Sequence, residues 1–137
     1  MINSRDPSEL CPRTKEKALA FKEKCAEQGI EVIFTSTYRD KESQDTLYAQ
    51  GRTKPGPIVT EVRGGYSFHN HRVAFDFVPV INGKAVWDDK LLWERCGTIG
   101  KDCGLEWGGS WKGFKDRPHM QDTNGFSIED YLAGKAA

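Results

Sequence analysis

The centre of the sequence contains the segment RVAFDFVPVINGKAV (residues 72–86), which decides how the chain is expected to fold. Its first eight residues are apolar at nearly every position, which is typical of a strand that is buried on both faces. Asp76 is the one carboxylate among them. Asn82-Gly83 is a strong signal for a tight hairpin turn, so the residues that follow it are expected to return beside the strand. The segment therefore predicts a β-hairpin with a carboxylate set in its apolar strand.

Further helices and strands are expected on both sides of this hairpin. Asp40 and Asp88 are the predicted N-caps of two helices, because their carboxylates can accept hydrogen bonds from the first free backbone amides. Residues 51–66 are rich in glycine and proline and predict a long loop, which in compact domains is often functional. The predicted helices cover about residues 13–28, 40–50 and 88–103 and a short segment after Ser127, and the predicted strands cover 31–36, 72–79 and short segments near Leu105 and His119. This irregular order favours an α+β fold with a small, mainly antiparallel sheet flanked by helices.

The apolar residues of the longer helices recur at helical spacing, which predicts the faces that pack on the sheet. These core positions are Ala18, Phe21 and Cys25 in the first helix and Leu91, Leu92, Cys96 and Ile99 in the third. The cysteines at positions 11, 25, 96 and 103 form no C-x-x-C pair, so they are expected to be reduced, buried thiols rather than zinc ligands. A length of 137 residues is typical of one domain, so residues 1–137 are predicted to form a single domain, with no separate binding domain.

Composition excludes several classes of partner. The 20 basic and 20 acidic residues cancel, so the sequence lacks the basic excess of nucleic-acid-binding and polybasic membrane-surface proteins. No run approaches the ~20 apolar residues of a membrane span. The first ten residues, MINSRDPSEL, lack the apolar core of a signal peptide. We therefore expect no nucleic acid, no membrane insertion, and synthesis into the cytoplasm of the producing cell.

A small set of residues could carry chemistry. His69, Asp76 and His119 supply two imidazoles and one carboxylate, which is a ligand set of catalytic zinc sites. Asp116 precedes His119 by three residues, and Pro118 between them restricts the backbone, so a further carboxylate is expected close to the site as a general base. From the residues alone, a structural role for these side chains is an equal alternative. The remaining histidine, His71, is a rival ligand because in an extended chain it shares a face with His69.

Three motifs, in this order, resemble those of the zinc D-alanyl-D-alanine carboxypeptidase and L-alanyl-D-glutamate endopeptidase family, whose members cleave peptidoglycan and share a fold with the Hedgehog signalling domain. The motifs read TYRDKESQ (37–44), SFHNHRVAFD (67–76) and EWGGSWKGFKDRPHM (106–120). The resemblance spans about residues 30–121 and looks closest to the single-domain endopeptidases that serve as phage endolysins and bacterial wall hydrolases. It implies one zinc ion bound by the two histidines and the aspartate named above, with Asp116 as the catalytic base.

The resemblance also implies roles for neighbouring residues. Arg39 and Gln44 would contact the substrate or its polarised carbonyl, and Ser67 would line the site. Trp107 and Trp111 could form a platform for the substrate, and packing over the sheet is an equal alternative for both. Two further positions stay open at this stage: Glu106 is the rival base, and Arg72 stands where the family usually has glycine, so the backbone there is expected to differ.

The predicted function is hydrolysis of peptidoglycan stem peptides, as an L-alanyl-D-glutamate endopeptidase that acts as a phage endolysin. The enzyme is expected to be a monomer and to reach the wall through a holin-type pore. The alternatives are a D-alanyl-D-alanine carboxypeptidase and a non-catalytic, zinc-stabilised peptidoglycan-binding module. Because the net charge is zero, any attraction to an anionic wall is expected to be local. Its source would be the basic residues of the motifs, Arg39, Arg72, Lys112, Lys115 and Arg117.

Overall fold

An antiparallel sheet forms the middle of the molecule in a computed structural model, which describes residues 1–113 and 115–135. Its strands follow the order β1-β2-β5-β4, and β3 pairs with the far end of β2 to complete the hairpin. The strand bounds are Glu31–Ser36 (β1), Ala74–Ile81 (β2), Lys84–Ala85 (β3), Glu106–Trp107 (β4) and His119–Gln121 (β5). The predicted α+β fold with a small antiparallel sheet is confirmed.

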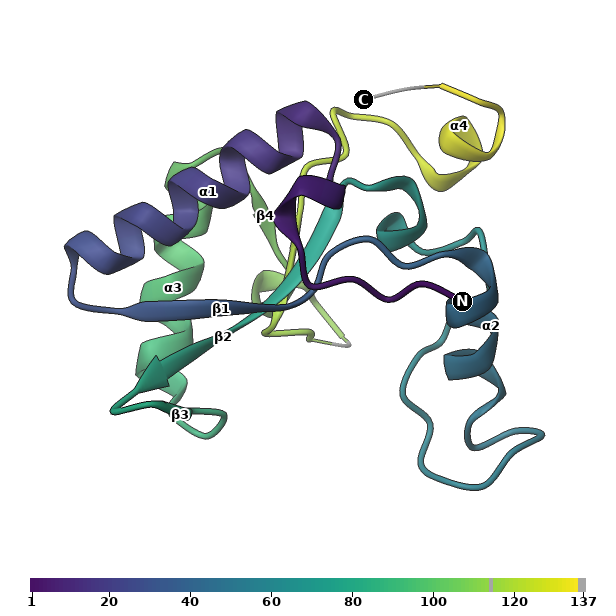
Figure 1. The fold of residues 1–137 in the computed structure, drawn as a ribbon, viewed down its shortest axis with the longest axis horizontal. Helices are drawn as coiled ribbons and strands as arrows, with labels where there is room; N and C mark the ends of the chain where they lie inside the picture. The colour runs from purple at the N-terminus through teal and green to yellow at the C-terminus, as the bar shows by residue number, and fades with distance from the viewer. Residues whose placement is uncertain (114, 136–137) are drawn as a thin grey trace.

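Helices α1 and α3 cover one face of this sheet, and α2 and α4 lie beyond one end of it (Figure 1). The α-helices are Pro12–Glu27 (α1), Lys41–Ala49 (α2), Lys90–Asp102 (α3) and Ile128–Leu132 (α4), and short 3-10 helices span Pro7–Glu9 (η1), Phe68–His71 (η2) and Gly108–Ser110 (η3). Helices α1 and α3 contact each other and the sheet, whereas α2 and the long loop after it project away from it. No helix among residues 1–113 and 115–135 is long and apolar enough to cross a membrane.

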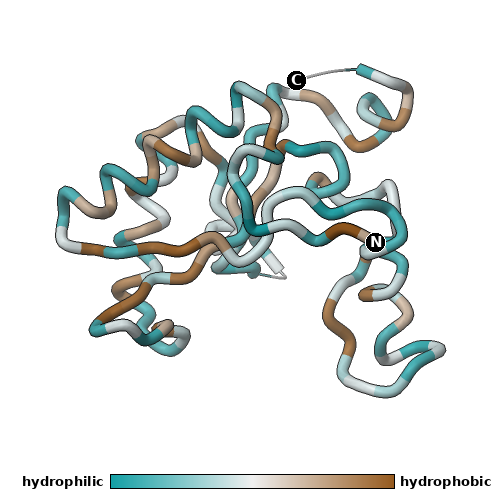
Figure 2. Tube along the Cα trace, viewed as in Figure 1, coloured by the Kyte–Doolittle hydropathy of each residue, from teal (hydrophilic) through white to brown (hydrophobic). Residues whose placement is uncertain are grey.

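The core lies between the sheet and the α1–α3 pair. The Phe21 ring on α1 lies 4.9 Å from that of Phe77 and 6.0 Å from that of Phe75, measured between ring centroids. Trp93 on α3 contacts Phe77 from the other side, with the centroids 5.4 Å apart. Figure 2 shows the same division along the chain, with apolar residues concentrated in β1 and β2 and polar ones along the outer side of α1. Burial of these aromatic rings therefore holds the two helices on the sheet.

The strand register divides the residues of β2 between two faces. Phe75 pairs with Met120 of β5, and Met120 pairs with Trp107 of β4, so this row faces the core. Because successive side chains of a strand alternate between faces, Asp76 and its partner His119 lie on the opposite face. The apolar character of β2 thus anchors the sheet, and the interrupting carboxylate is displayed on the face that the helices leave uncovered.

Most predicted elements are confirmed, with shifted ends in two cases. The central strand begins at Ala74 rather than residue 72 and continues to Ile81, where the Asn82-Gly83 turn begins. The third helix begins after Asp89, whose carboxylate accepts from the Leu92 amide at 3.1 Å, so the N-cap predicted at Asp88 is wrong. Asp40 does cap α2, accepting from the Ser43 amide at 2.8 Å.

The buried face of α3 also differs from the prediction. Leu91 is 72% exposed, and Trp93 takes its place in the core beside Leu92, Cys96 and Ile99. Leu91 shares a helix face with Glu94 and Arg95, three and four positions further on, and both of these are exposed, so this side of α3 points to solvent. All four cysteines are free thiols; Cys25 and Cys96 are buried as predicted, whereas Cys11 and Cys103 are only half-buried.

Candidate active site

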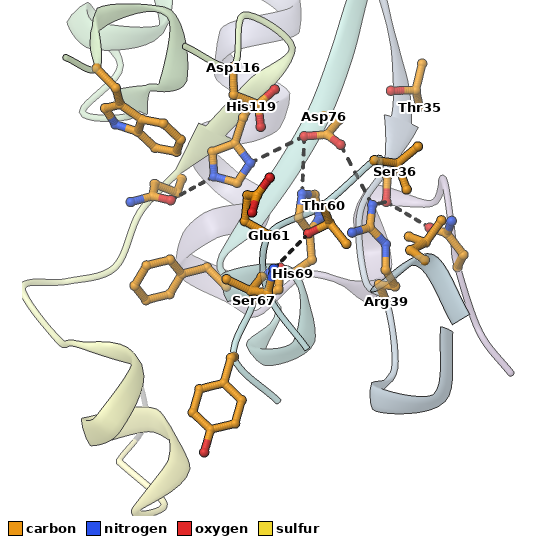
Figure 3. A pocket seen from close by; sticks show the side chains of 18 residues that line it. Thr35, Ser36, Arg39, Thr60, Glu61, Ser67, His69, Asp76, Asp116 and His119 are labelled. Atoms are coloured by element: carbon orange, nitrogen blue, oxygen red, sulfur yellow. Dashed lines mark hydrogen bonds and ion pairs between the residues drawn. The ribbon is translucent and has the colours of Figure 1, made fainter. Parts of the chain in front are cut away.

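Two histidines and one aspartate converge on the uncovered face of the sheet (Figure 3). His69 comes from η2, Asp76 from β2 and His119 from β5. The Asp76 Oδ1 atom lies 3.2 Å from His69 Nε2 and 3.4 Å from His119 Nδ1. One ligand atom from each of the three residues lies within 4.8 Å of the others. The sequence prediction that these three residues come together is therefore met by the geometry.

The ring of His69 is held by the backbone around it. Its Nδ1 atom lies 3.0 Å from the carbonyl oxygen of Thr37, and a carbonyl can only accept, so Nδ1 carries the proton. Its amide donates to the Ser67 hydroxyl, which caps η2, at 3.2 Å. Only 3% of the residue is exposed. His69 is thus fixed with the lone pair of Nε2 turned toward Asp76 and His119.

The ring of His119 faces the cluster through its other nitrogen. Its Nε2 atom lies 2.7 Å from the side-chain oxygen of Gln121, which leaves Nδ1 toward Asp76. Two imidazole lone pairs and one carboxylate oxygen are donors that zinc prefers, and hydrogen bonds to the outer ring nitrogens are the usual support of such ligands. The residues present therefore fit a metal ion, with one ligand each from η2, β2 and β5.

Charge is unevenly distributed between the two carboxylates of the site. Burial alone would raise the pKa of Asp76, but His69 and His119 outweigh it and lower that pKa well below its usual range. Burial raises the pKa of Asp116, the Asp76 charge adds to the rise, and His119, His69 and Arg39 oppose it. The site thus combines one strongly ionised carboxylate with one whose pKa is raised, an arrangement that suits a metal ligand beside a general base.

A glycine places Asp116 at the site. The Asp116 amide donates to the carbonyl of Gly108 at 3.0 Å, and a Cβ on Gly108 would overlap the Asp116 carbonyl oxygen. The His119 amide in turn donates to the Asp116 carbonyl at 3.1 Å, closing a tight turn through Pro118. The side chain lines the cavity beside the ligands (Figure 3). The predicted fixed relation between Asp116 and His119 is confirmed.

Arg39 borders the cluster of His69, Asp76 and His119 and lies beside Asp76. Its guanidinium lies 3.8 Å from Asp76 Oδ2 and donates to the Ser36 hydroxyl at 3.1 Å. Burial lowers the pKa of Arg39, and the charges of Asp76 and Asp116 oppose that shift. Among the residues that the structure describes, its Nε is the one buried side-chain nitrogen or oxygen without a hydrogen-bond partner. Arg39 thus lines the cavity as predicted, with donor capacity left over.

The direct substrate contact predicted for Gln44 does not fit its position. The residue is fully buried, and it does not line the cavity. Its Oε1 accepts from Arg39 Nη1 at 2.9 Å, and its Nε2 donates to Thr60 Oγ1 at 3.1 Å and to the Val62 carbonyl at 2.8 Å. The amide therefore has no free group to offer a substrate. It instead joins Arg39 to the long loop.

The two tryptophans have different positions: Trp107 is buried in the core, whereas Trp111 lines the cavity. Trp107 is 7% exposed, donates to the Arg117 carbonyl at 2.8 Å and packs between Gly97 and Gly109, so the substrate platform predicted for it is wrong. The reason is the strand register, which turns its side chain to the core face. Trp111 lines the cavity, with its ring centroid 5.2 Å from that of His119.

The open alternatives of the sequence are resolved by placement. His71 bonds to the Gly65 carbonyl at 2.8 Å and stacks on Tyr131, away from the ligand cluster. Glu106 lies on the edge strand β4 outside the cavity lining, so Asp116 is the better-placed base. Arg72 adopts the left-handed conformation (φ 65°, ψ 25°) at the end of η2. This is a conformation that glycine adopts at least cost, so the Cβ of Arg72 has not moved the backbone out of the glycine-favoured region.

The long loop supplies the part of the site that sequence reasoning missed. A cavity of about 610 Å³ contains the ligands, Asp116 and Arg39, and its far wall is residues 59–62. Figure 3 shows Thr60 and Glu61 of this loop facing the histidines. The glycine and proline content predicted a loop, but it could not predict that the loop would pack over the histidine cluster. Gln121, which holds His119, could have been found, because it is two residues along the same strand and so shares its face.

Together, these observations define a class of protein. Two histidines and an aspartate of a metal-binding type, a neighbouring carboxylate with a raised pKa and an enclosing cavity are the parts of a metal-dependent hydrolase.

Comparison with known proteins identifies the family. Residues 60–122 match a family model described as D-alanyl-D-alanine carboxypeptidase. The chain is 44% identical over 124 residues to the peptidoglycan L-alanyl-D-glutamate endopeptidase CwlK of Bacillus subtilis, covering 84% of this chain and 74% of that protein. It is 32% identical over 133 residues to an L-alanyl-D-glutamate peptidase of Listeria phage A118, covering 93% of this chain and 43% of that protein. The crystal structure of the Serratia marcescens L-Ala D-Glu endopeptidase ChiX superposes with a TM-score of 0.65 at 19% identity, over 95% of this chain and 92% of that one. The chain belongs to the D-alanyl-D-alanine carboxypeptidase and L-alanyl-D-glutamate endopeptidase family of peptidases.

Proposed function

We propose that this protein is a zinc-dependent L-alanyl-D-glutamate endopeptidase that hydrolyses peptidoglycan stem peptides. The observation that carries the proposal is the convergence of His69, Asp76 and His119 beside the carboxylate of Asp116 in one cavity. The 44% identity to CwlK supports the choice of bond, because that relative is named for cleavage between L-alanine and D-glutamate.

The three ligands would hold one zinc ion, which acts as a Lewis acid toward the scissile carbonyl and activates water when it is bound. The two ring tautomers favour such binding, because each histidine already turns one lone pair inward. Asp76 completes the set with a negative charge, and its lowered pKa keeps it ionised as a ligand.

The residues around this set perform the proton transfers and hold the substrate. Asp116 takes a proton from the attacking water and returns it to the leaving amine, for which its raised pKa suits it. Arg39 lines the cavity and is held in position by Gln44 and Ser36, so its guanidinium binds either the developing negative charge or a substrate carboxylate. Stem peptides carry such carboxylates. Trp111 and residues 59–62 enclose the peptide from the two sides of the cavity.

Digestion of purified peptidoglycan tests this function. We expect mass spectrometry to show stem peptides that begin with D-glutamate, with L-alanine left on the glycan, and elemental analysis to show one zinc per chain. A chelator should abolish release, and added zinc should restore it. Release of single alanine would establish the carboxypeptidase instead. Wall binding without any product would establish the non-catalytic module, and full activity after verified metal stripping would exclude a zinc enzyme.

We further propose that the protein acts as a monomeric phage endolysin, made in the host cytoplasm and passed to the wall through a holin-type pore. The phage relative at 32% identity supports this role. Expression in a host with and without a co-expressed holin tests it. Lysis is expected only with the holin, and equal lysis without it would refute the proposed release route. Sedimentation of the purified protein would show whether it is a monomer.

A further inference from the structure

A chain of hydrogen bonds leads from the metal ligand His119 to the edge of the sheet. His119 Nε2 lies 2.7 Å from Gln121 Oε1, and Gln121 Nε2 donates to Glu106 Oε2 at 2.8 Å. Gln121 follows His119 by two residues on β5, and Glu106 is its cross-strand partner on β4. All three side chains therefore lie on the site face of the sheet, in a line that leads outward from the cluster.

The direction of each bond in this chain is determined by Glu106. An ionised carboxylate can only accept hydrogen bonds, so the amide group of Gln121 must turn its NH₂ toward Glu106. The side-chain oxygen of Gln121 then faces His119, and an oxygen can only accept. His119 must therefore carry its proton on Nε2, which leaves the lone pair of Nδ1 toward Asp76. The exposed residue at the far end thus sets the tautomer of the ligand.

The other histidine of the cluster has no comparable dependence on a side chain. The tautomer of His69 is set by the backbone carbonyl of Thr37, which no substitution can turn around. Gln121 is 7% exposed, so water does not replace Glu106 readily as the partner of its amide. His119 is thus the ligand whose orientation depends on a side chain outside the cavity.

We propose that Glu106 and Gln121 are positioning residues that hold His119 in its metal-binding tautomer. This inference rests on the proposed zinc site. Loss of such an outer partner usually lowers metal affinity by about 10–100-fold. The size of the loss should follow the hydrogen-bonding character of residue 106, because an acceptor preserves the direction of the chain and a donor reverses it.

Three substitutions at position 106 test this order. Glu106→Gln retains an acceptor, so zinc affinity should stay within about threefold of the parent. Glu106→Ala removes the partner and should weaken zinc binding by about 10-fold. Glu106→Lys can only donate, so it would turn the Gln121 oxygen outward and present NH₂ to His119, with a loss approaching about 100-fold. Asp102→Lys, an equal change of charge at the exposed end of α3, is the control and should bind zinc like the parent.

Zinc dissociation constants from chelator competition are the main readout. Nitrogen-15 NMR of the histidine rings is the second, and it should show Nε2 of His119 protonated in the zinc-loaded parent and in Glu106→Gln. Thermal unfolding of the zinc-free variants separates lost affinity from lost folding, and Glu106→Ala serves if the lysine variant does not fold. Equal affinity in all variants would overturn the inference while leaving the zinc site intact. An equal loss in the glutamine and lysine variants would also overturn it, because charge rather than bond direction would then matter. A parent protein that binds no zinc would refute the proposed function itself.

Discussion

Substitution of Gln44 by methionine distinguishes a buried connector from a substrate contact. Methionine preserves most of the volume but removes the bonds to Arg39, Thr60 and Val62. The bond from the charged guanidinium is worth about 1.5–3 kcal/mol and each of the other two about 0.5–1.5 kcal/mol. Partial relaxation of the loop reduces the total, so we expect the free energy of unfolding to fall by about 3 kcal/mol. In a domain of this size, that corresponds to a decrease in Tm of roughly 10 °C.

Three measurements on the same variant test this expectation. Calorimetry gives the loss of stability, and hydrogen exchange should show faster exchange of the Val62 and Gly64 amides, which donate to the side chains of Thr60 and Asp45. Hydrolysis of peptidoglycan should slow as well, because Arg39 loses one of its anchors. Gln28→Met is the matched control, since Gln28 is exposed at the end of α1 and should leave all three measurements unchanged. Lost activity with unchanged stability and loop exchange would refute the connector role and restore the direct contact.

Three further predictions concern the base, a packed glycine and a helix cap. Asp116→Ala should bind zinc like the parent but lose about 10²–10⁴-fold in kcat, the usual contribution of a general base; unchanged turnover would refute the role of Asp116 as the base. Gly97→Ala should lower the free energy of unfolding by about 1–3 kcal/mol, because the Cβ of the alanine would overlap the Trp107 ring. An unchanged Tm would show that the packing around residue 97 adjusts freely. The hydrogen bond from the Ser43 amide lowers the pKa of the Asp40 carboxyl in the folded protein. The ionised carboxylate therefore stabilises the fold at pH values above the unfolded-state pKa of about 4. This stabilisation is lost as the pH falls through the lower pKa of the folded state. Asp40→Asn should therefore be less stable than the parent at pH 7, with the difference in Tm shrinking below about pH 4; a difference that is constant with pH would contradict this.

The fold was predictable because its signals are local. The alternation around Phe75 and Phe77, the Asn82-Gly83 turn and the cap at Asp40 each determine structure within a few residues. Two local predictions, the N-cap at Asp88 and the inward position of Leu91, were wrong by one or two residues, whereas the prediction for Trp107 failed because it depends on distant partners. Trp107 lies in a glycine-rich stretch, where the local sequence does not determine which way its ring points. The pairing of β4 with β5 turns the ring inward onto Gly97.

The same distinction applies to the site. The three proposed ligands and the proposed base could be named from the sequence because their spacing resembles a family motif, which carries long-range information that periodicity lacks. From the sequence, Glu106 was an alternative candidate for the base, because it is a carboxylate within the motif that contains Asp116 and His119. Its connection to His119 requires the register of β4 against β5, and no local pattern contains that register.

Arg72 shows how a chain can keep a backbone conformation while changing the residue that usually provides it. A residue with a Cβ in the left-handed region costs about 1–2 kcal/mol relative to the right-handed one. Here the guanidinium lies 3.8 Å from the centroid of the Tyr38 ring and donates to the carbonyl and the carboxylate of Glu9 at 2.7 and 2.9 Å. A cation–π contact is worth about 0.5–1 kcal/mol at such a site, and hydrogen bonds add a similar amount. These contacts offset the strain and tie the N-terminal segment to η2, which carries His69, so a residue other than glycine can hold the left-handed position.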